Sequence, residues 1–198
     1  MTDTTIVDPL NITNYNRDQC ELETFWLFSI LVAGKNSDTT SKTLSKFLRQ
    51  LPPWQTPFQA IRELGEVGLY NMLVENRVGQ YNRITKAIMG SLNLDLRTCT
   101  KEELMGVYGV SHKTSRFFLL HTRPFCDEIV LDTHILSWMK NKCGINDVPD
   151  NTPQNRKQYE TIASICKGLM ENRYPNMSLA QIDLLIWAEM SGRLKEAK

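Results

Sequence analysis

Two side chains near the middle of the chain, a lysine and an aspartate, have the residue types used in covalent catalysis. Lys113 lies in Gly109-Val-Ser-His-Lys-Thr114, and Asp132 follows in Leu131-Asp-Thr-His-Ile135. A lysine in the first turn of a helix faces the positive end of the helix dipole, which favours the uncharged amine that a nucleophile needs. An anchored carboxylate can orient that amine or stabilise positive charge developing on a sugar. The pair therefore predicts covalent catalysis, with helix capping as the alternative role for Asp132.

The elements that must hold these residues are predicted to be helices. Apolar residues recur at three- and four-residue intervals along nearly the whole chain, which indicates an all-α fold. The run Glu128–Leu131 suggests a strand, but it is too short and too isolated to form a sheet. The second half of the chain is predicted to form helices over 133–142, 152–171 and 178–193. In the first half, helical apolar faces are formed by residues 22–33, 44–51, 58–64, 69–73 and 81–92.

A helix, a tight turn and a second helix are predicted around Lys113. A capping box that begins at Thr100 starts the first helix, which ends near Val107, and a glycine then permits a sharp reversal. The turn and the N-terminus of the second helix present unpaired N–H groups, which are suited to bind a phosphate. The alternative is a plain helical turn without a ligand. The amides that would bind the phosphate are those of Gly109, Val110 and Ser111.

The positive charge of the chain is concentrated in two segments. Lys and Arg number 23 and Asp and Glu number 22, so the formal net charge is only +1. Basic residues nevertheless outnumber acidic ones within 35–49 and 77–123. A local basic footprint of this kind is typical of proteins that bind nucleic acid phosphates. The alternative is that these charged residues only lie on solvent-exposed faces of helices.

Cysteine usage and the lack of long apolar runs suggest where the protein acts. The five cysteines are scattered and form no CxxC pair, which predicts free thiols in a reducing compartment and neither a disulfide frame nor a metal site. No apolar run approaches the ~18 residues that cross a bilayer, and the first residues lack the pattern of a secretory signal. We therefore expect a soluble intracellular protein without membrane contact, in the cytoplasm or nucleoid, or in the nucleus of a eukaryote.

The segments around Lys113 and Asp132 resemble the helix-hairpin-helix DNA glycosylases, typified by endonuclease III and the 8-oxoguanine DNA glycosylases. Weaker similarity lies in residues 30–38 and 78–88, and all matching parts together cover residues 21–139. The resemblance implies that Lys113 forms a Schiff base and that Asp132 is the catalytic aspartate. It also implies a single two-lobed helical unit with the damaged base bound in the cleft between its lobes. The expected lobes are residues 35–124, with the hairpin at 101–121, and residues 1–34 plus 125–198.

The same resemblance assigns further DNA contacts in the first half of the chain. Lys35 or Asn36 lies in the loop whose side chain fills the gap left by the extruded nucleotide, and Arg83 lies in a basic segment expected to contact DNA. Two residues depart from the family pattern. Ser111 replaces the usual second glycine of the hairpin, and Tyr108 stands where proline is common. Serine still supplies a backbone amide, so the turn should still be able to bind a phosphate. The sequence does not determine the geometry of that binding.

The end of the chain, residues 179–198, resembles the tail of the compact second type of 8-oxoguanine glycosylase. In that group the C-terminal helix and the terminal lysine contribute to the base pocket. Trp187, Lys195 and Lys198 are therefore candidates for this pocket, with a place in the core as the alternative for Trp187. The four clustered C-terminal cysteines of the iron–sulfur branch are missing, so we expect no cluster and no other cofactor.

The resemblance as a whole implies a monomeric DNA repair enzyme, a bifunctional glycosylase and AP lyase that acts on double-stranded DNA containing 8-oxoguanine. Three alternatives remain open. The protein could remove oxidised pyrimidines, as endonuclease III does, or excise a mismatched base without lyase activity. It could also be a non-catalytic helix-hairpin-helix module that only binds DNA.

Overall fold

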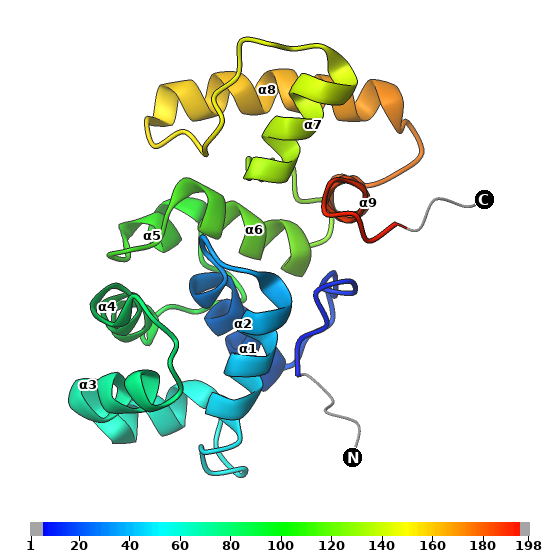
Figure 1. Cartoon of the computed structure of the whole chain (residues 1–198). Helices are drawn as coiled ribbons and strands as arrows, with labels where there is room; N and C mark the ends of the chain where they lie inside the picture. The colour runs from blue at the N-terminus through cyan, green and yellow to red at the C-terminus, as the bar shows by residue number, and fades with distance from the viewer. Residues whose placement is uncertain (1–5, 195–198) are drawn as a thin grey trace. The chain divides into compact units, whose positions relative to one another are not determined.

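The computed structural model describes residues 6–194, and the regular secondary structure among them is entirely helical (Figure 1). The prediction of an all-α fold is thereby confirmed, and residues 128–131 form an irregular link instead of a strand. No helix within 6–194 is both long and apolar enough to span a lipid bilayer. The helices are α1 (Gln19–Leu31), α2 (Ser37–Leu48), α3 (Pro57–Glu75), α4 (Tyr81–Ser91), α5 (Lys101–Gly106), α6 (His112–Thr122), α7 (Thr133–Cys143), α8 (Arg156–Arg173) and α9 (Leu179–Met190).

The chain divides into two compact units, residues 1–110 and 111–198. The first contains α1–α5 and the second contains α6–α9. This division differs from the expected lobes, which grouped residues 1–34 with the C-terminal part and α6 with the first half. The reason lies in α1, because every residue from Leu22 to Leu31 is buried and the helix contacts α2, α3 and α4. A helix that is buried on all sides forms the centre of its own unit.

Capping residues and a glycine close by in the sequence determine where helices of the first unit begin or are interrupted. Asp18 caps α1 by accepting the N–H of Glu21 at 2.8 Å, and the Glu21 carboxylate accepts the N–H of Asp18 at 3.0 Å. This reciprocal pair satisfies two amides that the helix itself cannot pair. Helix α3 is interrupted at Gly65, whose φ of 66° is left-handed. The interruption separates the two short helices that the apolar pattern predicts.

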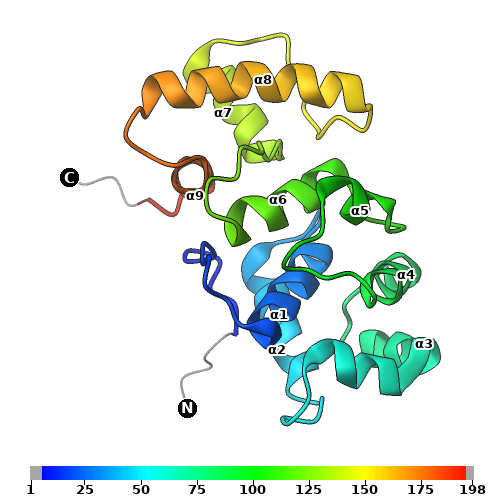
Figure 2. The same ribbon diagram turned by 180° about the vertical axis from the view of Figure 1, so that it is seen from behind.

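The second unit is built around a core shared by α7, α8 and α9. Trp138, Tyr159 and Ile186 are fully buried in this core, one from each helix. Helix α9 packs against α7 and also contacts α6 and α8, and in Figures 1 and 2 it is seen end-on beside α7. Because α9 touches all three other helices of the unit, it can bring side chains from separate parts of the sequence together.

Two helix boundaries in the second unit differ from the prediction. Helix α8 begins at Arg156 instead of 152, because the side chain of Asn155 accepts the N–H of Gln158 at 3.1 Å and caps the helix there. Helix α9 ends at Met190 instead of 193, and the turn that follows contains Gly192 with a left-handed φ of 72°. Both errors are a few residues long, which is the usual precision of boundaries predicted from pattern.

Candidate active site

The turn between α5 and α6 has the conformation that the sequence predicts. Gly109 has a φ of 81°, and a Cβ at this position would lie 2.8 Å from Cγ of Arg83. Only glycine therefore fits. Ser111, where the resemblance expects a second glycine, has an extended φ of −96° and serves as the N-cap of α6, accepting the N–H of Thr114 at 3.2 Å. Since its φ is negative, serine is accommodated there without strain and adds a cap.

Lys113 begins a row of side chains along one face of α6. It is half-buried, and its Nζ lies 5.6 Å from the centre of the Phe117 ring. The Phe117 ring in turn meets the ring of His121 edge-on at 5.0 Å. Residues spaced by four share a face of a helix, so Lys113, Phe117 and His121 form a continuous row.

Asp132 is held rigidly at the start of α7. Its Oδ1 accepts the N–H of Ile135 at 2.9 Å, so the aspartate is the N-cap of the helix. The side chain is half-buried. The capping role that the sequence allows is thus present in the structure, and the cap bond anchors the carboxylate in one place.

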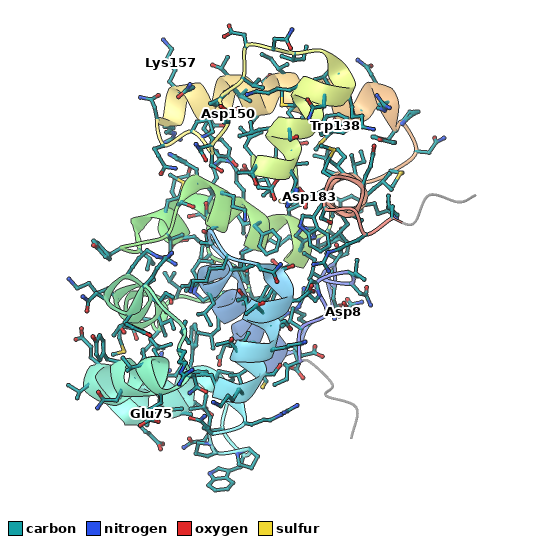
Figure 3. The ribbon with its side chains drawn as sticks, viewed as in Figure 1. Asp8, Glu75, Trp138, Asp150, Lys157 and Asp183 are labelled. Carbon is teal, nitrogen blue, oxygen red and sulfur yellow. The ribbon has the colours of Figure 1, made fainter. Side chains whose placement is uncertain are left out.

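A buried carboxylate on α9, Asp183 (labelled in Figure 3), contacts the last residue of the row along α6. Its Oδ2 lies 3.2 Å from Nε2 of His121. Burial raises the pKa of Asp183, and the negative charge of Asp132 raises it further, while the hydrogen bond and charge of His121 and the charge of Lys113 act in the opposite direction. Lys113 and Asp132 are therefore both within electrostatic reach of the same carboxyl group. All four residues belong to the second unit.

Sequence reasoning missed the roles of Asp183 and His121. The available signal was the position of Asp183 within the apolar run from Leu179 to Ile186, where a charged side chain is costly to bury without a partner. The partner of Asp183 could not be predicted from the sequence, because His121 lies 62 residues away along the chain.

The DNA-contact candidates of the first unit interact extensively with their own unit. Nζ of Lys35 donates to the carbonyl of Val78 at 2.7 Å, and burial together with the charge of Arg83 lowers its pKa. Asn36 is exposed and caps α2 by accepting the N–H of Thr39 at 3.0 Å. Direct contact of these side chains with DNA stays a prediction.

Arg83 has a structural role that the sequence did not indicate. Its guanidinium donates to the carbonyls of Gly109 at 3.0 Å and Ile30 at 3.1 Å, and to the side chain of Gln80 at 2.6 Å. Burial lowers its pKa. Arg83 thus ties the turn at Gly109 to the end of α1, and its contact with DNA likewise stays a prediction.

The base-pocket candidates lie at the end of α9. Trp187 is half-buried, one turn after Asp183, and the guanidinium of Arg193 lies 4.6 Å from the centre of its ring. Lys195 and Lys198 lie outside the described residues. Among residues 6–194, no group of three His, Cys, Asp or Glu side chains is placed to hold a metal ion. The five cysteines are free thiols.

The fold is similar to that of solved 8-oxoguanine DNA glycosylases, while no protein-family model matches the chain. A structure of the Methanocaldococcus jannaschii 8-oxoguanine glycosylase/lyase in complex with 15mer DNA containing 8-oxoguanine is similar over 91% of this chain and 86% of that chain, with 17% identity and a TM-score of 0.70. The 8-oxoguanine DNA glycosylase of Thermotoga maritima is similar over 89% of this chain and 83% of that chain, with 19% identity and a TM-score of 0.69.

Proposed function

We propose that this protein is a base-excision repair enzyme that removes 8-oxoguanine from double-stranded DNA and then cleaves the abasic site. One observation carries the proposal. A lysine in the first turn of α6 and an anchored aspartate at the start of α7 lie in the same compact unit, in a fold similar to that of 8-oxoguanine glycosylases. A nucleophilic amine beside a fixed carboxylate is suited to attack at a sugar carbon.

The first step is base release from a nucleotide that has left the duplex. Extrusion costs a few kcal/mol and is cheapest at a damaged base pair. Nζ of Lys113 then attacks C1′ of the sugar with its lone pair and loses a proton. The bond from C1′ to the base breaks, and the base leaves with the bonding electrons and takes up a proton. Asp132 stabilises the positive charge that develops on the sugar.

The second step is strand cleavage. The sugar ring opens to give a Schiff base between Nζ of Lys113 and C1′. Loss of a proton from C2′ then expels the 3′ phosphate by β-elimination, and water releases the lysine from the remaining aldehyde. The amides of Gly109, Val110 and Ser111, with the basic segments, bind the DNA backbone, which gives salt-dependent affinity without a choice of sequence.

A panel of duplexes tests the proposal, each with one 8-oxoguanine, one thymine glycol, one mismatch or one abasic site. We expect release of 8-oxoguanine, a nick on its 3′ side, and a covalent adduct when borohydride reduces the Schiff base. Preference for thymine glycol would indicate an enzyme for oxidised pyrimidines. Excision without nick or adduct would indicate a glycosylase without lyase activity, and binding without release would indicate a non-catalytic DNA-binding module.

A further inference from the structure

We propose that Arg116 and Tyr159 are positioning residues that fix the Lys113 amine relative to the Asp132 carboxylate. Neither residue is predicted from the sequence to take part in the reaction. The inference deepens the proposed function and rests on it, because it concerns how the two reacting groups of that site are held.

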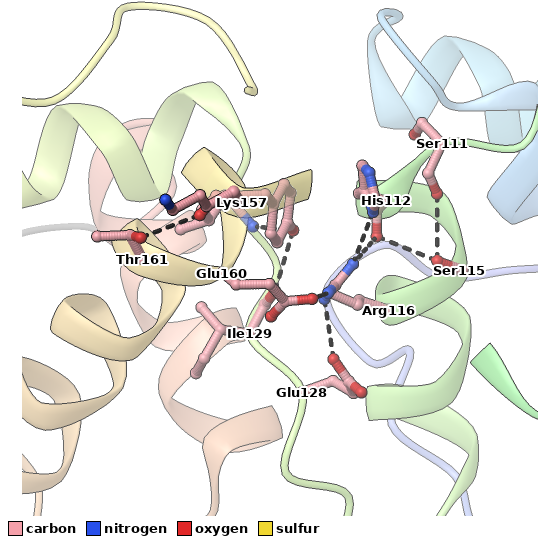
Figure 4. A network of polar contacts seen from close by, with 11 residues as sticks. Ser111, His112, Ser115, Arg116, Glu128, Ile129, Lys157, Glu160 and Thr161 are labelled. Atoms are coloured by element: carbon pink, nitrogen blue, oxygen red, sulfur yellow. Dashed lines mark hydrogen bonds and ion pairs between the residues drawn. The ribbon is translucent and has the colours of Figure 1, made fainter. Parts of the chain in front are cut away.

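Arg116 lies on α6, one turn after His112 (Figure 4). Its side chain is only 1% exposed. Its Nη1 donates to the carbonyl of His112 at 3.2 Å and lies 3.3 Å from Nδ1 of the same residue. Its Nε pairs with Glu128 at 2.8 Å, and its Nη2 pairs with Glu160 of α8. The guanidinium thus joins the first turn of α6, which carries Lys113, to the segment that leads to Asp132.

Tyr159 of α8 completes the connection from the other side. Its ring lies beneath the Arg116 guanidinium, 4.3 Å from the central carbon, and 5.4 Å from the ring of His112. Its hydroxyl donates to the carbonyl of Ile129 at 3.0 Å and accepts the N–H of Leu131 at 2.8 Å. Burial raises the pKa of this phenol, which keeps it neutral and able both to donate and to accept.

The segment 128–131 depends on such side chains because it has no regular structure. Buried backbone amides and carbonyls outside helices and sheets need other partners. Tyr159 supplies two of them, and the hydroxyl of Thr152 donates to the carbonyl of Leu131 at 2.8 Å. Leu131 is the residue directly before Asp132, so the phenol fixes the chain at the point where the carboxylate emerges.

Only the Arg116 side chain of this ionic network is buried, since Glu128 and Glu160 are 23% and 45% exposed, and burying a charge is a poor way to gain stability alone. Apolar side chains of similar volume often stabilise a core as well as a buried ion pair does, or better. The guanidinium fixes the orientation of the groups around it, because its planar donors bond acceptors only at certain angles. The network therefore serves geometry, and covalent attack is sensitive to errors of about 1 Å, which can reduce rates ~100-fold.

Tyr159→Phe tests this inference, because it keeps the ring and removes only the hydroxyl. Tyr174→Phe, a partly buried tyrosine at the end of α8, is the matched control. We expect Tyr159→Phe to slow single-turnover release of 8-oxoguanine ~10- to 100-fold, with DNA affinity unchanged. Cleavage of a preformed abasic site should fall less, since it requires Lys113 but no charge stabilisation during base release. Arg116→Lys, which keeps the charge and loses the fork, should show the same split.

The outcomes distinguish failure of the proposed function from failure of the inference about Arg116 and Tyr159. An inactive wild-type protein that forms no borohydride adduct would refute the proposed function and this inference with it. An active wild type with a Tyr159→Phe variant of equal excision rate would overturn the inference alone. The inference would also fail if the excision rate, the abasic-site cleavage rate, the DNA affinity and the thermal unfolding midpoint all decreased together in both variants. Arg116 and Tyr159 would then only stabilise the fold.

Discussion

Nε2 of His121 lies 3.2 Å from Oδ2 of Asp183, and both side chains are buried. The contact joins α6 to α9 at the far end of the row that starts with Lys113. The charges of Lys113 and Asp132 also act on the pKa of Asp183, in opposite directions.

The first prediction concerns this pair and pH. Burial and the charge of Asp132 raise the pKa of Asp183 above its ordinary 3.8, so the folded chain holds this proton more tightly than the unfolded chain does. The contribution of Asp183 to the free energy of unfolding therefore falls as pH rises from the unfolded pKa through the folded one. Asp183→Asn cannot titrate. We expect the stability of wild type relative to this variant to decrease as the pH rises above 3.8, measured by urea unfolding at a series of pH values. Parallel stability curves would contradict the assignment.

The second prediction identifies the nucleophile. Lys113→Gln removes the amine and keeps a side chain of similar length, so we expect no borohydride adduct and no strand cleavage, with DNA binding changed by less than about threefold, since only one charge is lost. Lys157→Gln, on the exposed start of α8, is the matched control and should form the adduct as wild type does. An adduct in Lys113→Gln would show that another amine reacts.

The third prediction separates the two roles of Asp132. Asparagine caps helices as well as aspartate does, so Asp132→Asn should unfold at nearly the wild-type temperature. Without the charge, base release should still fall ~100-fold or more, by analogy with loss of one stabilising group in other active sites. Asp132→Ala should lose both roles and cost ~1 kcal/mol of stability as well. Calorimetry and single-turnover excision measure the two effects, and full activity in Asp132→Asn would exclude an electrostatic role.

The fourth prediction concerns the turn. Gly109→Ala places a Cβ at a left-handed φ and 2.8 Å from Cγ of Arg83, so we expect a loss of ~1–3 kcal/mol in stability and weaker DNA binding. Gly106→Ala is the control, since nothing lies within 4 Å of its added Cβ and its φ is not positive. That variant should be neutral or slightly stabilised. Equal behaviour of the two variants in chemical denaturation would rule out strain at Gly109.

Features that depend on neighbours in the sequence were predictable. The caps at Thr100 and Asp132 use partners three residues away, so residue type and spacing are enough to identify them. The helical class follows from periodicity in the same way. Lys113 and Asp132 could be selected as a pair for the same reason, because each stands at the start of a predicted helix.

Features that depend on residues far apart were decided by the tertiary structure alone. The pairing of His121 with Asp183, the network of Arg116 with Tyr159, and the contacts of Arg83 with Gly109 join residues between 26 and 62 positions apart. The sequence around each of these side chains indicates only that it is buried, polar or basic, and not which residue it contacts. Which buried charge meets which partner depends on how helices pack against one another, and packing is set by the sum of many weak contacts across the unit.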